Sequence, residues 1–284
     1  MAGALTALSA CGSSGSSDLK VTETEPGANQ YAYTGVKEVK GGTVKVTFTN
    51  KGKVPHEVSL ARVDGTHTQA EVLDALKKVT SGQNQPLADY LHPVGGVANV
   101  KPGRTASASV VLPPGKYYAL DTDSGMANNA PPYFTQGAVK AFEVKGGKAT
   151  GSLPSAQQTV TIKDAPGDKY EFAAPATLKS GKTTLELDNQ SKTNYHHVQL
   201  APLLPGKTLA EVKKALASNG PPMGPPPVNF DEVQGTEVVE HNSKIVADVN
   251  LKPGNYVMLC FVADRDGKGG PHFGKGLLKE VKVS

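Results

Sequence analysis

The segment Val110–Leu120 (VVLPPGKYYAL) gives the clearest indication of the fold. Val249–Leu259 (VNLKPGNYVML) repeats its pattern 139 residues later. In both segments an apolar run leads through a Pro-Gly turn into a second apolar run, which is typical of two antiparallel strands. Three further pairs match in the same order at offsets of 139 or 140: Ala70–Leu76 with Ala210–Leu216, His56–Leu60 with His196–Leu200, and Pro132–Phe134 with Pro271–Phe273. Four blocks in one order at a near-constant offset indicate an internal duplication.

The duplication predicts two domains, a join between them and an N-terminal segment within the 284 residues. Residues 30–147 and 168–284 are the two predicted domains, and each is long enough for a hydrophobic core of its own. The Gly-, Ser- and Pro-bearing stretch 146–155 is the predicted join. Residues 1–29 form a separate N-terminal segment.

Within each repeat the apolar residues recur with a period of two. Thr43–Thr49 and Lys182–Asp188 alternate polar with apolar residues, as half-buried strands do. One amphipathic helix interrupts each set of strands, at Thr68–Val79 and at Thr208–Ala217, and Glu211 follows Thr208 at capping-box spacing. We therefore predict an all-β protein with two tandem Greek-key β-sandwiches, each with one short α-helix.

Composition excludes several classes of function. The net charge is only +4 and the lysines are scattered among acidic residues, so no basic face for nucleic acid is expected. No run approaches the roughly 18 apolar residues of a spanning helix, which excludes a polytopic membrane protein. The motifs of serine hydrolases, zinc proteases and phosphate-binding loops are missing from the sequence, so we expect no enzyme.

The N-terminal segment has the features of a bacterial lipoprotein. Leu8-Ser-Ala-Cys11 has the order of a lipobox, and the Gly/Ser run 12–17 after it is typical of a flexible tether. No Lys or Arg precedes Cys11, whereas a signal peptide begins with a basic region, so the natural start lies upstream or the form is trimmed. We predict a lipid on Cys11 that anchors the chain to the extracytoplasmic face of the cell membrane.

The second repeat carries a spaced set of histidine and cysteine. Asn194-Tyr-His-His197 precedes one strand, Tyr256-Val-Met-Leu-Cys260 ends another, and Pro271-His-Phe-Gly-Lys-Gly-Leu277 leads into the last. This arrangement resembles the cupredoxin family, small β-sandwiches that hold mononuclear copper. The resemblance covers residues 168–284, and in outline also 30–147.

The resemblance implies roles for five residues. Cys260 corresponds to the thiolate ligand of one copper ion, His196 and His272 to its imidazole ligands, and Leu277 to the axial position that usually holds Met. A thiolate and two imidazoles suit copper in both oxidation states. The resemblance thus implies electron transfer or copper handling, with a redox protein or copper donor as partner. His197 would lie at the surface or support a ligand from outside.

Strand parity separates the two adjacent histidines. His196, Val198 and Leu200 share one face of the strand, and the same inward pattern occurs in His56–Leu60 of the first repeat. His196 is therefore the ligand candidate, and His197 points outward.

Two alternatives stay open. Eleven residues separate Cys260 from His272, whereas the family has a short loop there. Zinc could use the same three ligands, or the protein could be a metal-free pair of sandwiches with a binding or structural role. A Cys260 sulfur within roughly 4 Å of imidazole nitrogens of both His196 and His272 would favour a metal site, given metal–ligand bonds near 2 Å.

The first repeat is a degenerate copy. It keeps His56, but Asp121, Tyr133 and Ala138 stand where the second repeat has its thiol, its second imidazole and its axial residue. One imidazole and one carboxylate do not form a soft trigonal site. We therefore predict a structural or docking role for this half, with His56 as a core or turn residue.

Overall fold

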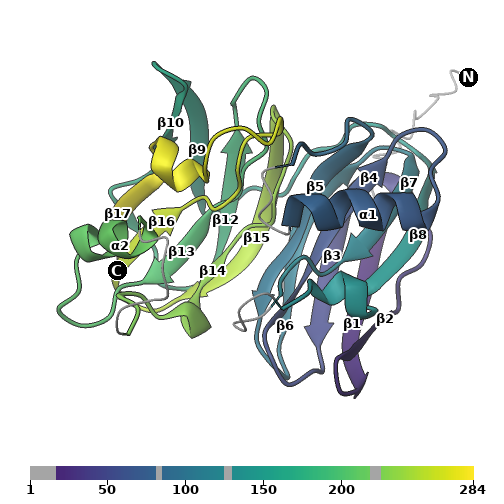
Figure 1. Ribbon diagram of the computed structural model, residues 1–284, viewed down its shortest axis with the longest axis horizontal. Coiled ribbons are helices and arrows are strands. Elements are labelled where there is room, and N and C mark those ends of the chain that lie inside the picture. Colours follow the sequence, from purple (N-terminus) through teal and green to yellow (C-terminus); the bar gives the residue numbers. More distant parts are fainter. Residues whose placement is uncertain (1–16, 81–84, 125–129, 218–224) are drawn as a thin grey trace, which may run out of the picture.

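A computed structural model describes residues 17–80, 85–124, 130–217 and 225–284. It confirms the predicted all-β fold, in which the described residues form paired strands with one short α-helix in each half. The first half (residues 17–147) and the second half (residues 158–284) lie side by side (Figure 1). The predicted lipidation site, Cys11, lies outside the described residues.

The first half consists of two sheet layers. One layer has the strands β1 (Ser17–Gly27), β2 (Gln30–Thr34), β3 (Val39–Asn50) and β6 (Thr105–Leu112). The other has β4 (His56–Val63), β5 (Leu91–Val100), β7 (Gly115–Leu120) and β8 (Val139–Gly147). The helix α1 (Gln69–Thr80) connects β4 to β5, and the 3₁₀ turn η1 (Tyr133–Gln136) precedes β8.

The second half repeats this order. One layer has β9 (Gln158–Ala165), β10 (Lys169–Ala173), β12 (Gly181–Asn189) and β15 (Ser243–Leu251). The other has β11 (Thr177–Leu178), β13 (Gln199–Pro202), β14 (Gln234–Gly235), β16 (Gly254–Leu259) and β17 (Leu278–Val283). The helix α2 (Leu209–Leu216) and the 3₁₀ turns η2 (Phe230–Glu232) and η3 (His272–Lys275) lie in its connections.

The duplication reaches further toward the N-terminus than its sequence signal. β1 pairs in parallel with β3, as β9 does with β12, and these pairings place Glu23 opposite Asn50 and Ile162 opposite Asn189. The residues of each equivalent pair are 139 apart. β1 is thus part of the first sandwich, although the sequence prediction assigned residues 1–29 to the signal and tether.

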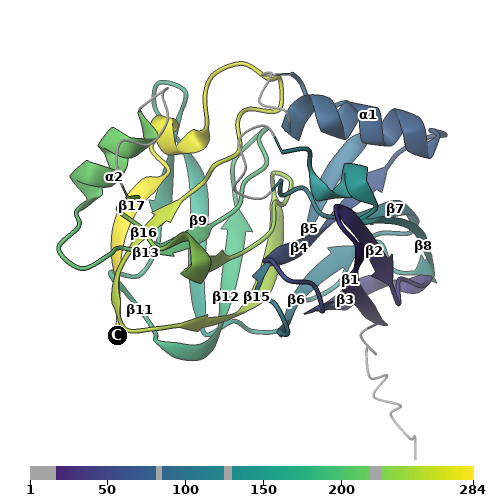
Figure 2. The ribbon, with the colours of Figure 1, turned by 60° about the horizontal axis from the view of Figure 1, so that its bottom comes forward.

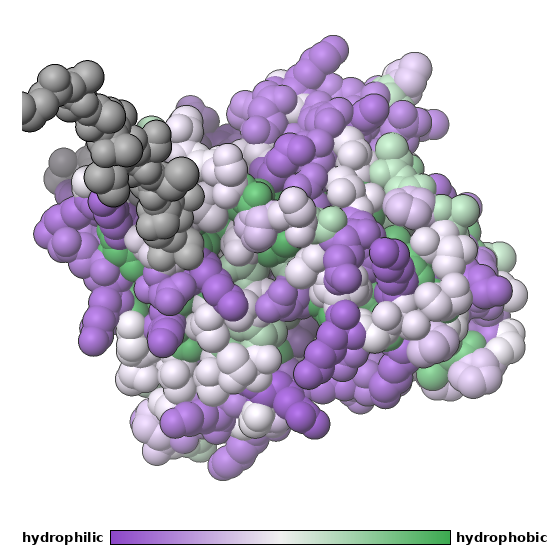
Figure 3. Space-filling model, turned by 180° about the vertical axis from the view of Figure 1, so that it is seen from behind, coloured by the Kyte–Doolittle hydropathy of each residue, from purple (hydrophilic) through white to green (hydrophobic). Residues whose placement is uncertain are grey.

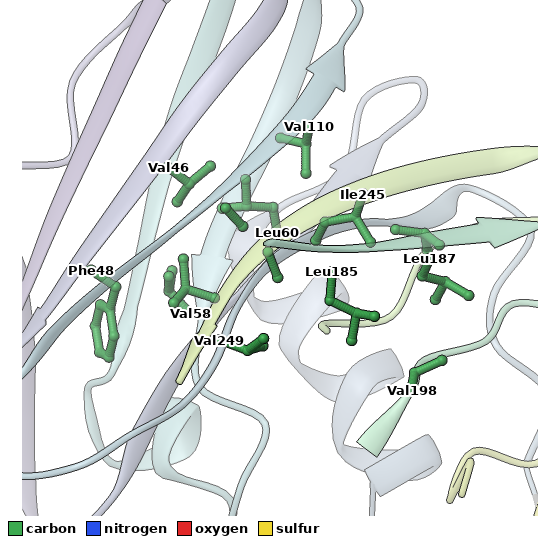
Figure 4. Packing of buried hydrophobic residues seen from close by; sticks show 14 of the residues in the cluster. Val46, Phe48, Val58, Leu60, Val110, Leu185, Leu187, Val198, Ile245 and Val249 are labelled. Atoms are coloured by element: carbon green, nitrogen blue, oxygen red, sulfur yellow. The ribbon is translucent and has the colours of Figure 1, made fainter. Parts of the chain in front are cut away.

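The two halves share one continuous sheet. β6 pairs with β15 at Ala108 and Ala247, which joins the two four-stranded layers edge to edge. Buried side chains from both halves form one hydrophobic cluster, in which Val110 and Ile245 lie at the join (Figure 4). This pairing leaves neither β6 nor β15 as an exposed edge.

Each helix covers the outer face of its strands (Figure 2). α1 buries Val72 against β4, β5 and β7, and α2 buries Val212 against β13 and β16. α2 begins with the predicted capping box, in which the Thr208 hydroxyl accepts a hydrogen bond from the Glu211 amide and the Glu211 carboxylate accepts from the Thr208 amide.

The rear face of the molecule is mainly hydrophilic, with small apolar areas between polar side chains (Figure 3). Among the described residues, neither α1 nor α2 combines the length and the apolar character that a bilayer crossing requires.

Replacing Gly276 by Ala should destabilise the second half. Gly276 has φ 109°, and a Cβ there would lie 2.3 Å from the carbonyl oxygen of Tyr170. We expect a loss of about 2–4 kcal/mol, because left-handed strain adds to a backbone clash. Urea unfolding followed by circular dichroism measures it.

The matched control is Gly206→Ala. Gly206 also has a positive φ, 75°, but no atom lies within 4 Å of its added Cβ. Strain alone should cost about 1–2 kcal/mol there. Equal losses in the two variants would contradict the close approach at Gly276.

Candidate metal centre

Three buried side chains converge at one end of the second half. The Cys260 sulfur lies 3.8 Å from Nδ1 of His196 and 3.7 Å from Nδ1 of His272. All three residues are fully buried. His196 precedes β13 and is held by two backbone hydrogen bonds to Val239, Cys260 directly follows β16, and His272 is the first residue of η3.

The spacing of these atoms fits ligands of a common ion. Bonds of 2.3 Å to sulfur and 2.0 Å to nitrogen, at a trigonal angle of 120°, place the two ligand atoms about 3.7 Å apart. The observed separations from Cys260 to both imidazoles agree with that value. One thiol and two imidazoles are also the donor set that soft or borderline ions such as copper and zinc prefer.

The long loop between Cys260 and His272 does not separate them. The carbonyl of Cys260 accepts a hydrogen bond of 2.9 Å from the Phe273 amide, and the His272 amide donates to the carbonyl of Val262 at 2.9 Å. The two ends of the loop are therefore hydrogen-bonded to each other, and Cys260 and His272 lie close together. The distance criterion for a metal site, set from the sequence, is met.

Asp264, within that loop, orients His272. Its Oδ1 lies 3.1 Å from Nε2 of His272, so that Nδ1 of the ring faces Cys260. Tyr170 and Asn194 also donate to this oxygen at 3.1 Å, and Lys275 donates to the other oxygen. Although burial opposes it, hydrogen bonds from Lys275 and His272 lower the pKa of Asp264. A carboxylate in this position fixes the ring and its tautomer.

Asp264 was missed by the sequence analysis, which gave it no role in orienting a ligand. Its signal was weak, because three acidic or basic neighbours in the charged run Ala263–Gly270 look equally solvated. Only the folded loop separates Asp264, 12% exposed at its side chain, from Asp266 at 59%.

Burial keeps all three cluster groups neutral when no ion is bound. It lowers the pKa of His196 to about 2 and raises the pKa of the Cys260 thiol to about 12. Burial also lowers the pKa of His272, more than Asp264 raises it. Both imidazoles are therefore free of the extra proton, and ion binding has to displace one proton, from the thiol.

Leu277 and His197 flank the cluster. Leu277 is fully buried, its amide donates to the carbonyl of His272, and its carbonyl accepts from the Cys260 amide. His197 is half-buried, and its Nε2 accepts a hydrogen bond of 2.9 Å from the amide of Phe261. His197 thus contacts the residue after Cys260 and is not part of the cluster itself.

In the first half, His56 lies in the corresponding place and is fully buried. Its Nδ1 is 2.7 Å from Oδ2 of Asp121, which stands where the second half has Cys260. The ring also packs against Tyr133 and Tyr31, with centroids 4.6 and 5.2 Å away. The ring therefore faces a carboxylate where His196 faces a thiol.

No family model and no curated protein matches the chain. Among solved structures it is similar to a multicopper oxidase (15% identity, 94% of this chain and 88% of the other, TM-score 0.25). It is similar to a copper nitrite reductase from Nitrosomonas europaea (12% identity, 94% of this chain and 93% of the other, TM-score 0.28). It is also similar to auracyanin A, a "blue" copper protein from Chloroflexus aurantiacus (16% identity, 45% of this chain and 98% of the other, TM-score 0.31). At these values the fold assignment rests on the strand pairing and not on the likeness.

One expectation is corrected by these similarities. The sequence motifs led us to expect no enzyme, but an oxidase and a reductase are among the similar structures. That exclusion was wrong and is withdrawn.

Asp264→Asn should weaken metal binding without unfolding the protein. The amide cannot accept from Lys275 and hold the His272 ring as the carboxylate does, so copper affinity should fall about 10–100-fold. Competition with a chromophoric chelator measures the dissociation constant. Asp266→Asn, in the same loop but exposed, is the control and should bind as the wild type does. Equal affinity in both variants would show that Asp264 does not position His272.

Proposed function

We propose that the second half binds one copper ion through His196, Cys260 and His272 and serves electron transfer. The observation that carries this proposal is the pair of distances from the Cys260 sulfur, 3.8 and 3.7 Å, to two imidazole nitrogens. Copper supplies a one-electron step between its two oxidation states. A fully buried thiol, with no other cysteine among the described residues to pair with, is consistent with this role.

The protein's contribution is a rigid ligand frame. Each ligand is fixed by backbone hydrogen bonds: His196 to Val239, Cys260 to Leu277 and to Phe273, and His272 to Val262. Such a frame keeps the ligands nearly in place when the charge of the ion changes, so little reorganisation accompanies the electron. Leu277 adds an apolar wall and no further donor.

Phe261 offers a short path for an electron from Cys260 to the protein surface. This residue follows Cys260 directly and its side chain is 38% exposed, whereas His272 is covered completely. Phe261 also lies edge-on to Phe273, with centroids 6.0 Å apart. An exposed aromatic side chain next to a buried ligand favours a protein partner that docks there.

Titration of the purified protein with copper tests the proposal. One equivalent should produce an intense visible band from thiolate-to-copper charge transfer, which ascorbate bleaches and an oxidant restores. Cys260→Ser should abolish the band, and the control His241→Gln, at an exposed histidine outside the cluster, should retain it.

Two results would count against the proposal. Without a band or stoichiometric binding, the second half would be a metal-free module. A stoichiometric complex that does not cycle would indicate copper handling instead of electron transfer.

We also propose that a lipid on Cys11 tethers the protein to the extracytoplasmic face of the membrane. The lipobox order Leu8-Ser-Ala-Cys11 and the Gly/Ser run after it support this.

Cys11→Ser tests the anchor separately from the copper site. In cells that express the full chain, the wild type should partition into the detergent phase and the variant into the aqueous phase. Both should show the same copper band, because Cys11 is not a ligand in the proposal. Equal partitioning of the two proteins would refute lipidation at Cys11.

A further inference from the structure

A second group of possible ligands lies in the first half, on the other side of the His56 ring. Nε2 of His56 is 3.6 Å from Oε1 of Glu23 and 3.5 Å from Oε1 of Glu25. Glu23 and Glu25 are on β1, and their spacing of two places both on one side of the strand. The ligand atoms of the three residues lie within 4.8 Å of one another.

Two of these side chains are buried and carry polar atoms that have no hydrogen-bond partner. Glu23 and His56 are both 0% exposed at their side chains. Within the described part of the chain, neither carboxylate oxygen of Glu23 nor Nε2 of His56 makes a hydrogen bond. Burying a carboxylate in this way is costly unless a cation compensates it.

The tautomer of His56 makes the arrangement less favourable still. Asp121 accepts hydrogen bonds from the amides of Glu57 and Asp123, which identifies it as an acceptor, and its Oδ2 faces Nδ1 of His56. In a neutral ring the proton lies on Nδ1, and the lone pair on Nε2 then points toward the two glutamates. A lone pair and two carboxylates repel one another unless a positive charge lies between them.

The distances distinguish two sources of that charge. A protonated imidazole would make charge-assisted hydrogen bonds of about 2.7–2.9 Å to a carboxylate. Ligands bound at 2.0–2.2 Å in tetrahedral geometry are instead about 3.3–3.6 Å apart. The observed 3.5 and 3.6 Å from His56 to both glutamates match a shared ion.

The second half provides the comparison. Strand register places Ile162 at the position of Glu23, where it is fully buried in the core. Asp164 stands at the position of Glu25. Asp164 accepts a hydrogen bond from the amide of Lys192, and Glu25 accepts one from the amide of Lys53, which is the equivalent residue of the first half. The fold thus accepts an apolar residue where the first half has Glu23, so a sandwich of this kind does not require the buried acid.

We propose that Glu23, Glu25 and His56 bind a divalent first-row cation, with zinc as the ion whose geometry fits. Two carboxylates and one imidazole are harder donors than the cluster around Cys260, so the two halves would select different ions. Three protein ligands leave a fourth position for water or another small ligand. Glu25, 13% exposed at its side chain, connects the site to solvent.

Zinc titration of Cys260→Ser protein, with its soft cluster disabled, tests the site. Calorimetry should show one zinc ion per chain. Adding Glu23→Ile, the residue found at the same place in the second half, should weaken binding by about 100-fold or more, since even groups outside the coordination sphere contribute 10–100-fold. Adding Asp164→Asn, the counterpart of Glu25 in the second half, should leave it unchanged.

Thermal unfolding gives an independent readout. Zinc should raise the Tm of the Cys260→Ser protein, and Glu23→Ile should raise the Tm without zinc while removing the response to it. Gly52→Ala is a second variant that keeps all three ligands, because its Cβ would lie 2.7 Å from oxygens of both glutamates. It should also reduce zinc affinity.

Three results would overturn the proposal. The first is no zinc binding by folded Cys260→Ser protein. The second is binding that persists in Glu23→Ile, which would place the ion elsewhere. The third is a loss of stability in zinc-free Glu23→Ile that makes its Tm fall instead of rise, which would show that Glu23 pairs with a protonated His56.

Discussion

A buried amide in each half positions the histidine on which its site depends. Asn189, at the end of β12, is fully buried and donates hydrogen bonds to the carbonyls of Asn194, Val239 and Glu240. These bonds tie the segment before His196 to the strand bridge that holds it. Asn50 does the same in the first half through Val54 and Val100. Each buried amide thus links its loop to neighbouring segments by hydrogen bonds, so the loop has little freedom to move.

One frame with a fixed imidazole therefore supports two different environments. In the second half, Nδ1 of His196 faces the thiol, and Ile162 stands at the strand position that Glu23 has in the first half. In the first half, Asp121 takes the Nδ1 side and Glu23 the Nε2 side. Both sides of the ring have thus changed from soft or apolar to hard and acidic. The difference between the halves lies in a few side chains on an unchanged backbone pattern.

The sequence predicted the features that local pattern encodes and missed those that depend on long-range pairing. Period-two segments and the repeat were enough for the sandwiches and the helices, whereas the grouping of His196, Cys260 and His272 came from the resemblance to a known family. β1 was missed because its inward series Leu19, Val21, Glu23 ends in a charged residue. Asp264 was missed because its partners lie far away in the sequence, Tyr170 on β10 and Asn194 in the loop after β12. In both cases an acid at an inward position was the available signal, and burial alone shows its meaning.

The first half also contacts the loop that orients His272. Arg265, the residue after Asp264, donates to the carbonyl of Leu91 at 2.8 Å, and its own carbonyl accepts from the Leu87 amide at 2.9 Å. It also pairs with Glu240 at 2.6 Å. The loop that orients His272 is therefore held from both halves. A loop of that length would be too mobile to fix a ligand by itself, since loops derive their order from the surfaces they contact. The first half thus contributes to the rigidity of a site to which it donates no ligand.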